Sequence, residues 1–157
     1  MDSEQRFEDK NRERSIVNAR VLPFSCEAVF GAFTNPQLLK EWWGPNGFSN
    51  TFHEFDLKPG GAWRFTMHAP DGAAYENFCQ FVEIKPFERI VIDHIEPVHS
   101  FRLIADITRT RMGTELKFNM TFALREEYER VKDFVRAANE QNFDRLEAVL
   151  QKIKLTG

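Results

Sequence analysis

The chain has few residues suited to covalent cross-linking or to binding nucleic acid. Only two of its 157 residues are cysteines, Cys26 and Cys79, which make a poor disulfide framework for a domain of this size. The net charge is −3, so the chain lacks the basic surface of a nucleic-acid-binding protein. No apolar run is long enough for a membrane span or a signal peptide. We therefore expect a cytoplasmic protein without nucleic-acid or membrane partners.

Motifs of nucleophilic, phosphate and metal chemistry are missing as well. The chain contains no Gly-x-Ser-x-Gly elbow, no P-loop and no dinucleotide-binding fingerprint. None of its four histidines forms an i, i+4 pair or neighbours a cysteine. We expect solvent-exposed or singly hydrogen-bonded histidines, with no metal and no cofactor. These absences favour a binding protein over an enzyme.

The two cysteines suggest structural roles. Cys26 falls in the first turn of a short predicted helix, where the helix dipole favours the thiolate. No histidine base is apparent near it in the sequence, so the position predicts a small buried hydrophobe. Cys79 lies within a β-type run and predicts strand packing.

The aromatic residues are abundant but unevenly distributed among types. Sixteen Phe and three Trp stand against only two Tyr. Phe has no hydrogen-bonding group, so this content belongs in a core or in an apolar cavity. A chain of this length can bury roughly 68–70% of its unfolded surface, which is enough for one domain to fold without a disulfide or a metal.

The chain divides into a short tail and one domain. Residues 1–14 are mostly charged, which predicts a flexible N-terminal tail before a single domain over 15–157. Residues 15–22 predict a strand, and Ser25 and Asn35 are placed to cap two short helices. Six β-type runs separated by turn residues follow at 48–57, 62–68, 74–84, 89–95, 100–109 and 114–124.

A helical period returns near the C-terminus. From about residue 126 to residue 154, one stripe contains Val131, Phe134, Val135, Ala138, Asn142, Leu146, Val149 and Ile153. At 1.5 Å per residue this helix is about 40 Å long, which is enough to cross a small sheet. The apolar face of the strands needs a cover, so we expect the helix to lie on the sheet.

Two motifs mark turns between these elements. Residues 56–61 read Asp-Leu-Lys-Pro-Gly-Gly, in which the proline fixes its own φ and the glycines accept conformations that a Cβ resists. The alternation of Trp63, Phe65 and Met67 after this turn predicts a half-buried strand. Earlier in the chain, residues 42–45 read Trp-Trp-Gly-Pro, two large aromatics followed by a helix-breaking pair.

The order of elements resembles the helix-grip fold of the START-like (SRPBCC) superfamily. Within it, Trp42-Trp43-Gly44-Pro45 and Asp56-Leu57-Lys58-Pro59-Gly60-Gly61 resemble the hallmarks of the family named after the activator of the heat-shock protein 90 ATPase. The resemblance covers roughly residues 15–155. It implies an α+β fold, with two short helices after the first strand and a curved antiparallel sheet of about seven strands wrapped on a long C-terminal helix. It also implies a cavity between the sheet and that helix.

The chain departs from the family pattern at two places. Family members often carry a Gly-Trp pair in the last helix, where this chain has Asn142 and Phe143. Relatives also tend to have glycine in the strand that here contains Cys79. We expect these differences to reshape the cavity, so the ligand of a relative does not transfer to this chain.

The predicted function is the binding of a small apolar or aromatic molecule in that cavity. The expected lining is Trp43, Trp63, Phe65, Phe101, Phe118, Met120, Val135, Asn139 and Phe143. Apolar burial would drive binding, and Asn139 on the inner face of the helix would orient the ligand. By strand alternation, Arg64 and Arg102 point to solvent.

Two alternative functions stay open at this point. An exposed apolar patch at Trp42 and Trp43 would make the chain a co-chaperone-like module with a chaperone partner. An enzyme of the cyclase or hydrolase type would use Asp93, His94 or Glu76 as acid and base, and would need two such groups facing one cavity. The sequence also leaves a homodimer open.

Overall fold

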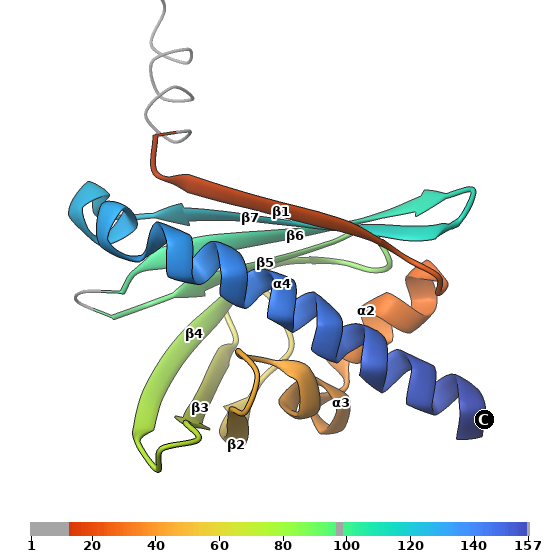
Figure 1. The fold of residues 1–157 in the computed structure, drawn as a ribbon, viewed down its shortest axis with the longest axis horizontal. Coiled ribbons are helices and arrows are strands. Elements are labelled where there is room, and N and C mark those ends of the chain that lie inside the picture. The colour runs from red at the N-terminus through yellow and green to blue at the C-terminus, as the bar shows by residue number, and fades with distance from the viewer. Residues whose placement is uncertain (1–12, 97–98, 157) are drawn as a thin grey trace, which may run out of the picture.

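A computed structural model describes residues 13–96 and 99–156 and shows one antiparallel sheet with a long helix across it (Figure 1). The strands are β1 (Ser15–Leu22), β2 (Ser49–Phe55), β3 (Ala62–His68), β4 (Ala74–Lys85), β5 (Arg89–His94), β6 (Phe101–Thr110) and β7 (Gly113–Phe122). The helices are α2 (Cys26–Thr34), α3 (Pro36–Trp42) and α4 (Arg125–Thr156). This arrangement confirms the predicted fold. The predicted tail falls mostly on residues 1–12, which lie outside the described residues, and stays a prediction.

The short helices begin where the sequence places their caps. The Ser25 hydroxyl accepts a hydrogen bond from the Ala28 N–H at 3.1 Å, and the Asn35 side-chain oxygen accepts one from the Gln37 N–H at 3.0 Å. Each bond satisfies an N–H group that has no partner within its helix. Pro36 occupies the first turn of α3, where a missing N–H carries no penalty.

The sheet has the strand order β1-β7-β6-β5-β4-β3-β2 and curves around α4 (Figure 1). Its register shifts between Phe52 and Glu54 in β2, and again between Phe81 and Glu83 in β4. An irregularity of this kind adds local twist and bend to a strand. The bends turn β2, β3 and β4 toward the helix, so the sheet has a concave face.

Helix α4 packs on that concave face with six of the eight residues of the predicted stripe buried or half-buried, but two residues toward its ends are exposed. Phe143, Leu146 and Leu150 are buried, whereas Phe134 and Ile153 are 66% and 41% exposed. The helix crosses a curved surface, so the buried side drifts around it and a straight 3.6-residue stripe assigns its ends wrongly. No helix in the described part of the chain is both long enough and apolar enough to span a membrane.

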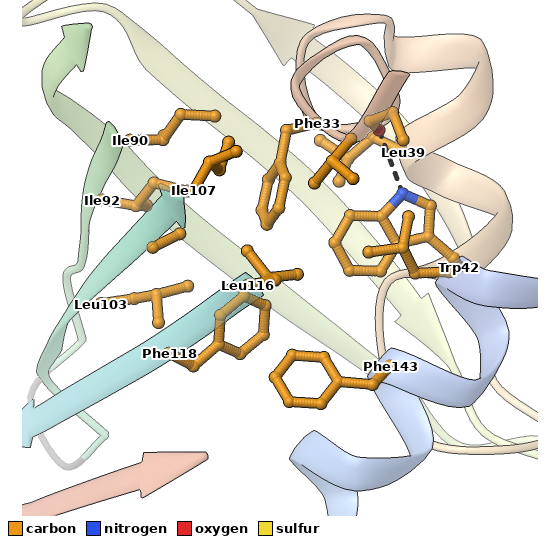
Figure 2. Packing of buried hydrophobic residues seen from close by; sticks show 14 of the residues in the cluster. Phe33, Leu39, Trp42, Ile90, Ile92, Leu103, Ile107, Leu116, Phe118 and Phe143 are labelled. Atoms are coloured by element: carbon orange, nitrogen blue, oxygen red, sulfur yellow. Dashed lines mark hydrogen bonds between the residues drawn. The ribbon is translucent and has the colours of Figure 1, made fainter. Parts of the chain in front are cut away.

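The main core lies between the sheet, the two short helices and the C-terminal half of α4 (Figure 2). Phe118 of β7 meets Phe143 of α4 with ring centroids 4.9 Å apart, and Phe33 meets Trp42 at 4.8 Å. The indole Nε1 of Trp42 donates to the Ala32 carbonyl at 3.0 Å. Aromatic side chains therefore fill this end of the molecule in edge-on pairs, as the large Phe content predicts.

The turn at residues 56–61 is held by backbone hydrogen bonds on both sides. The Gly60 N–H donates to the Phe81 carbonyl at 2.7 Å, and the Phe81 N–H donates to the Gly61 carbonyl at 2.9 Å. A Cβ built on Gly61 would lie 1.9 Å from the carbonyl oxygen of Asp56. The second glycine is therefore required by contact with the backbone, and the turn directs β3 along β4.

Replacing Gly61 with alanine should destabilise the fold more than a similar change in another turn. Gly61→Ala forces a backbone shift, and we expect the free energy of unfolding to fall by about 3 kcal/mol, as for severe overpacking. The control is Gly72→Ala, where φ is +93° but no atom lies within 4 Å of the new Cβ. It should cost about 1 kcal/mol. Urea unfolding of both variants tests this, and equal losses would contradict it.

Candidate functional site

A cavity of about 530 Å³ lies between the concave face of the sheet and the N-terminal half of α4. The sheet contributes residues of β3 to β7, and the segment after α3 contributes Trp43, Gly44 and Pro45. The rim is open to solvent, because Tyr75, His99 and Phe134 line the cavity and are each more than half exposed. A small molecule can therefore enter from this side.

Apolar side chains make up most of the cavity wall. They are Trp43, Phe65, Met67, Phe101, Leu103, Phe118, Met120, Phe122, Val131, Phe134 and Val135. Seven of the nine predicted lining residues are among those that line the cavity: Trp43, Phe65, Phe101, Phe118, Met120, Val135 and Asn139. That these residues contact a ligand stays a prediction.

The structure places Trp63 and Phe143 outside the cavity. Trp63 is fully buried and packs against Trp43 with ring centroids 5.3 Å apart, so Trp43 supplies the wall there. Phe143 is fully buried against Phe118 and belongs to the main core. Both side chains point to the concave side as predicted, but another aromatic ring separates them from the cavity. Asn142, which departs from the family pattern, lines the cavity. The other two departures, Phe143 and Cys79, are buried in the core and do not line it.

Two buried asparagines of α4 interrupt the apolar wall. Asn139 is 4% exposed, and its Nδ2 donates to Asn18 Oδ1 of β1 at 3.1 Å and to Met120 Sδ at 3.3 Å. Asn142 is 7% exposed, and its Oδ1 accepts the Gly44 N–H at 2.7 Å. A buried amide needs such partners, because an unpaired polar group in an apolar wall costs free energy.

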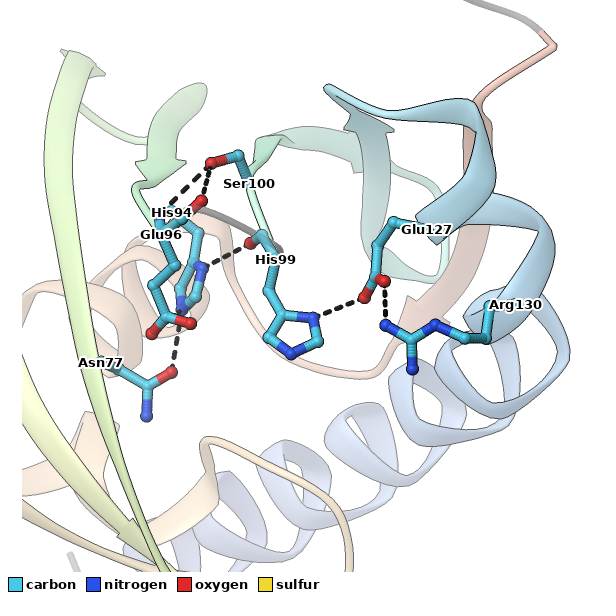
Figure 3. A network of polar contacts seen from close by, with 7 residues as sticks. All are labelled: Asn77, His94, Glu96, His99, Ser100, Glu127 and Arg130. Atoms are coloured by element: carbon cyan, nitrogen blue, oxygen red, sulfur yellow. Dashed lines mark hydrogen bonds and ion pairs between the residues drawn. The ribbon is translucent and has the colours of Figure 1, made fainter.

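A network of polar side chains lies at the opposite end of the cavity from the two asparagines (Figure 3). His94 of β5 has Nδ1 2.8 Å from the His99 carbonyl and Nε2 2.8 Å from Asn77 Oδ1. The His99 ring reaches across to α4, where its Nδ1 lies 2.5 Å from Glu127 Oε1. Glu127 is only 4% exposed and also pairs with Arg130. This network connects the β5–β6 connection to the first turn of α4.

The two histidines differ in what they can do chemically. Burial lowers the pKa of His94, although the His99 carbonyl and the Glu96 carboxylate near its ring favour the charged form. Both ring nitrogens of His94 have hydrogen-bond partners, the His99 carbonyl and Asn77 Oδ1. His99 uses only Nδ1, and within the described residues no group bonds to its Nε2, which points away from Glu127 in Figure 3. A carboxylate that holds one imidazole nitrogen leaves the other as a general base.

Two of the three predicted acid–base residues, His94 and Glu76, line the cavity, but only the His94 ring points into it. His94 faces inward, whereas Asp93 pairs with Arg102 on the outer face at 2.7 Å. The Glu76 carboxylate accepts from Thr66, which alternates with the cavity residues Phe65 and Met67 and so points outward. Sequence reasoning missed His99 and Glu127, which lie 28 residues apart in sequence. Their only sequence signals are a histidine between strands and an acidic helix start.

The other histidines and both cysteines have structural partners. His53 contacts Thr66 and His68 contacts Thr51, as expected for single hydrogen bonds. Cys26 and Cys79 are free and buried, which confirms their assignment as packing residues, and burial raises the pKa of the Cys79 thiol. Within the described residues, no three His, Cys, Asp or Glu side chains come together in a group that could hold a metal ion.

Arg145 of α4 lies behind the part of the cavity wall that follows α3 and holds it in place. Its guanidinium donates to backbone carbonyls of the segment that contains the Trp-Trp-Gly-Pro motif. The acceptors are Glu41 at 2.8 Å, Trp43 at 3.2 Å, Gly44 at 2.7 Å, Pro45 at 2.9 Å and Phe48 at 2.9 Å. Burial lowers the pKa of Arg145, but an arginine remains charged at neutral pH. The motif is therefore held by a charged, multidentate donor.

The fold and the hollow under α4 define the class of protein. A curved seven-stranded sheet that grips a long C-terminal helix over a cavity is the helix-grip architecture of START-like proteins. Residues 23–151 match the model of the family described as activator of Hsp90 ATPase homolog 1-like protein. The chain belongs to this family.

Solved structures with the same fold come from several bacteria. A Nitrosomonas europaea protein superposes with a TM-score of 0.81 at 21% identity, over 90% of this chain and 96% of its own. An Arthrobacter aurescens protein superposes with a TM-score of 0.83 at 18% identity, over 90% of this chain and 88% of its own. A Staphylococcus aureus protein, described as of unknown function, superposes with a TM-score of 0.72 at 16% identity, over 90% of this chain and 95% of its own. No curated protein matches the chain. At these identities the likeness shows the fold alone.

Replacing Arg145 with lysine should destabilise the fold strongly. Lysine keeps the charge but has three donors at one point and cannot reach the five carbonyls, so buried acceptors lose their partners. We expect Arg145→Lys to lower the free energy of unfolding by about 2–3 kcal/mol. Arg102→Lys is the control, because that half-exposed arginine pairs with Asp93 on the outer face. It should cost less than about 1 kcal/mol in urea unfolding, and similar losses would contradict the assignment.

Proposed function

We propose that the chain binds a small, neutral, largely apolar or aromatic molecule in the cavity between α4 and the sheet. The observation that carries this proposal is a cavity of about 530 Å³ with apolar walls and a few polar groups at defined places. Sites for small organic molecules have this composition and this size. Each Å² of apolar surface that a ligand buries contributes about 25 cal/mol, so an aromatic body alone supplies useful affinity.

The charges of the lining favour a neutral ligand over an anionic one. The described residues that line the cavity include Glu76, Glu96 and Glu127, and none of them is Lys or Arg. A buried anion needs a paired cation or several donors, and a second negative charge near these carboxylates is unfavourable. Fatty acids and other carboxylates are therefore poor candidates for this cavity.

The chaperone alternative has less support from the arrangement of the tryptophans. Trp42 is fully buried in the core, and Trp43 is half-buried in the cavity wall. The pair therefore does not form the exposed apolar patch on which that alternative depends. Trp43 instead presents an aromatic surface to a small molecule.

Blocking the cavity should abolish binding of a simple aromatic probe. We expect wild-type protein to bind naphthalene in isothermal titration calorimetry. Ala138 lines the cavity, so Ala138→Trp should weaken binding at least tenfold by filling the space. The neighbouring Ala137 is exposed, and Ala137→Trp should leave binding unchanged. Binding that survives Ala138→Trp would place the ligand elsewhere, and native mass spectrometry of freshly purified protein would show any retained natural ligand.

A second candidate function, proton transfer, is favoured by the contact between His99 and the buried Glu127. The free Nε2 of His99 could take a proton from a carbon next to a carbonyl and return it, which requires no further reactant. The probe is acetone in D₂O, a ketone without an aromatic body, whose methyl protons exchange through its enolate. The protein should accelerate this exchange, measured by NMR, and His99→Gln should remove the acceleration. His68→Gln is the control. Equal exchange with and without protein would exclude this activity on the ketone.

A further inference from the structure

The hydrogen bonds around Asn139 fix which of its amide atoms faces the cavity. The Glu140 carboxylate only accepts, so the Asn18 atom 2.8 Å from it is the nitrogen. Asn18 Oδ1 therefore faces Asn139 at 3.1 Å and must accept, which assigns Asn139 Nδ2 as the donor. Asn139 Oδ1 is left over as an acceptor, and no described group donates to it.

The same reasoning fixes the amide of Asn142 in the opposite sense. The Gly44 N–H can only donate, so the side-chain atom 2.7 Å from it is Oδ1. Asn142 Nδ2 is left over as a donor, and among the described residues it has no acceptor. In the described residues, three side-chain nitrogen or oxygen atoms have neither accessible surface nor a hydrogen-bond partner: Asn50 Oδ1, Trp63 Nε1 and Asn119 Oδ1. Asn139 Oδ1 and Asn142 Nδ2 are not among them, so they keep accessible surface, and both residues line the cavity.

One free acceptor and one free donor therefore lie one turn apart on the same wall. Residues at i and i+3 of a helix have Cβ atoms about 5–6 Å apart, so one small polar group can reach both amides. A hydrocarbon would leave both atoms unpaired after displacing water from them, which costs binding energy. A carboxylate offers no hydrogen to Asn139 Oδ1.

We propose that the cavity recognises a carboxamide or lactam attached to an apolar or aromatic body. The ligand N–H donates to Asn139 Oδ1, and the ligand carbonyl accepts from Asn142 Nδ2. This inference rests on the proposed binding function and adds the polar group that the ligand carries. The rest of the molecule lies among the apolar residues of the wall, and its neutral charge suits the carboxylates of the rim.

Three probes with one aromatic body test the assignment by calorimetry on the full chain. Naphthalene has no polar group, 2-acetonaphthone adds a carbonyl, and 2-naphthamide adds a carbonyl and an N–H donor. Each matched hydrogen bond should tighten binding about fivefold, so we expect naphthamide to bind more tightly than the ketone and the ketone more tightly than naphthalene.

Two variants assign the two contacts separately. Asn139→Leu removes the acceptor and should reduce the affinity for naphthamide to that for the ketone, while the other two affinities stay unchanged. Asn142→Asp keeps the oxygen that accepts from Gly44 and removes the donor. In this variant, the ketone should bind no more tightly than naphthalene. Circular dichroism checks that each variant is folded, and the wild-type ranking tests the inference without either variant.

The outcomes separate this inference from the function on which it rests. Failure of all three probes to bind would overturn the proposed function. If naphthalene binds and naphthamide binds no more tightly, the function stands and the carboxamide assignment is wrong. An equal loss for all three probes in folded Asn139→Leu would show a structural role only and would also overturn the assignment.

Discussion

The contact between Arg145 and the segment after α3 holds the parts of the site together. This segment turns sharply at Gly44, where φ is +102°, and its carbonyls have left the hydrogen-bonding pattern of the helix before β2 begins. The guanidinium of Arg145, in the middle of α4, pairs with four of them and with the carbonyl of Glu41 in α3. Asn142, one turn earlier, holds the Gly44 N–H. The helix and the Trp-Trp-Gly-Pro segment are therefore fixed to each other, and Trp43 becomes cavity wall.

This contact divides α4 into two halves with different surroundings. After Asn142, the residues Phe143, Leu146 and Leu150 are buried in a core that α2, α3 and the sheet fill with aromatic rings. Before Asn142, the inward residues Val131 and Val135 face the cavity instead. On the side of the β5–β6 connection, the His99–Glu127 contact links this half of the helix to the other wall of the cavity. The packed core and the cavity thus lie at different ends of one helix.

The sequence predicts the fold well because its signals are local. The Ser25 cap, the glycine turn and the alternation of Phe65 and Met67 each depend on residues a few positions apart. The cavity walls follow from the same alternation, which is why seven of the nine predicted lining residues do line the cavity. Whether an inward ring reaches the cavity depends on its neighbours in space, and Trp63 is covered by Trp43. The pairing of His99 with Glu127 depends on where a connection meets a distant helix, and no local pattern encodes that position.

The polar atoms of the wall are the strongest argument that the cavity is a site rather than imperfect packing. An apolar void could be closed by larger side chains, because substitutions that fill a cavity commonly stabilise a protein. Asn139 and Asn142 instead introduce amides that need partners, and the described residues satisfy only one end of each, through Asn18 and Gly44. Those bonds also set the direction of each amide, so the free ends are a fixed acceptor and a fixed donor. Preorganised polar atoms on a rigid helix favour one ligand chemistry over another because they need not reorient on binding.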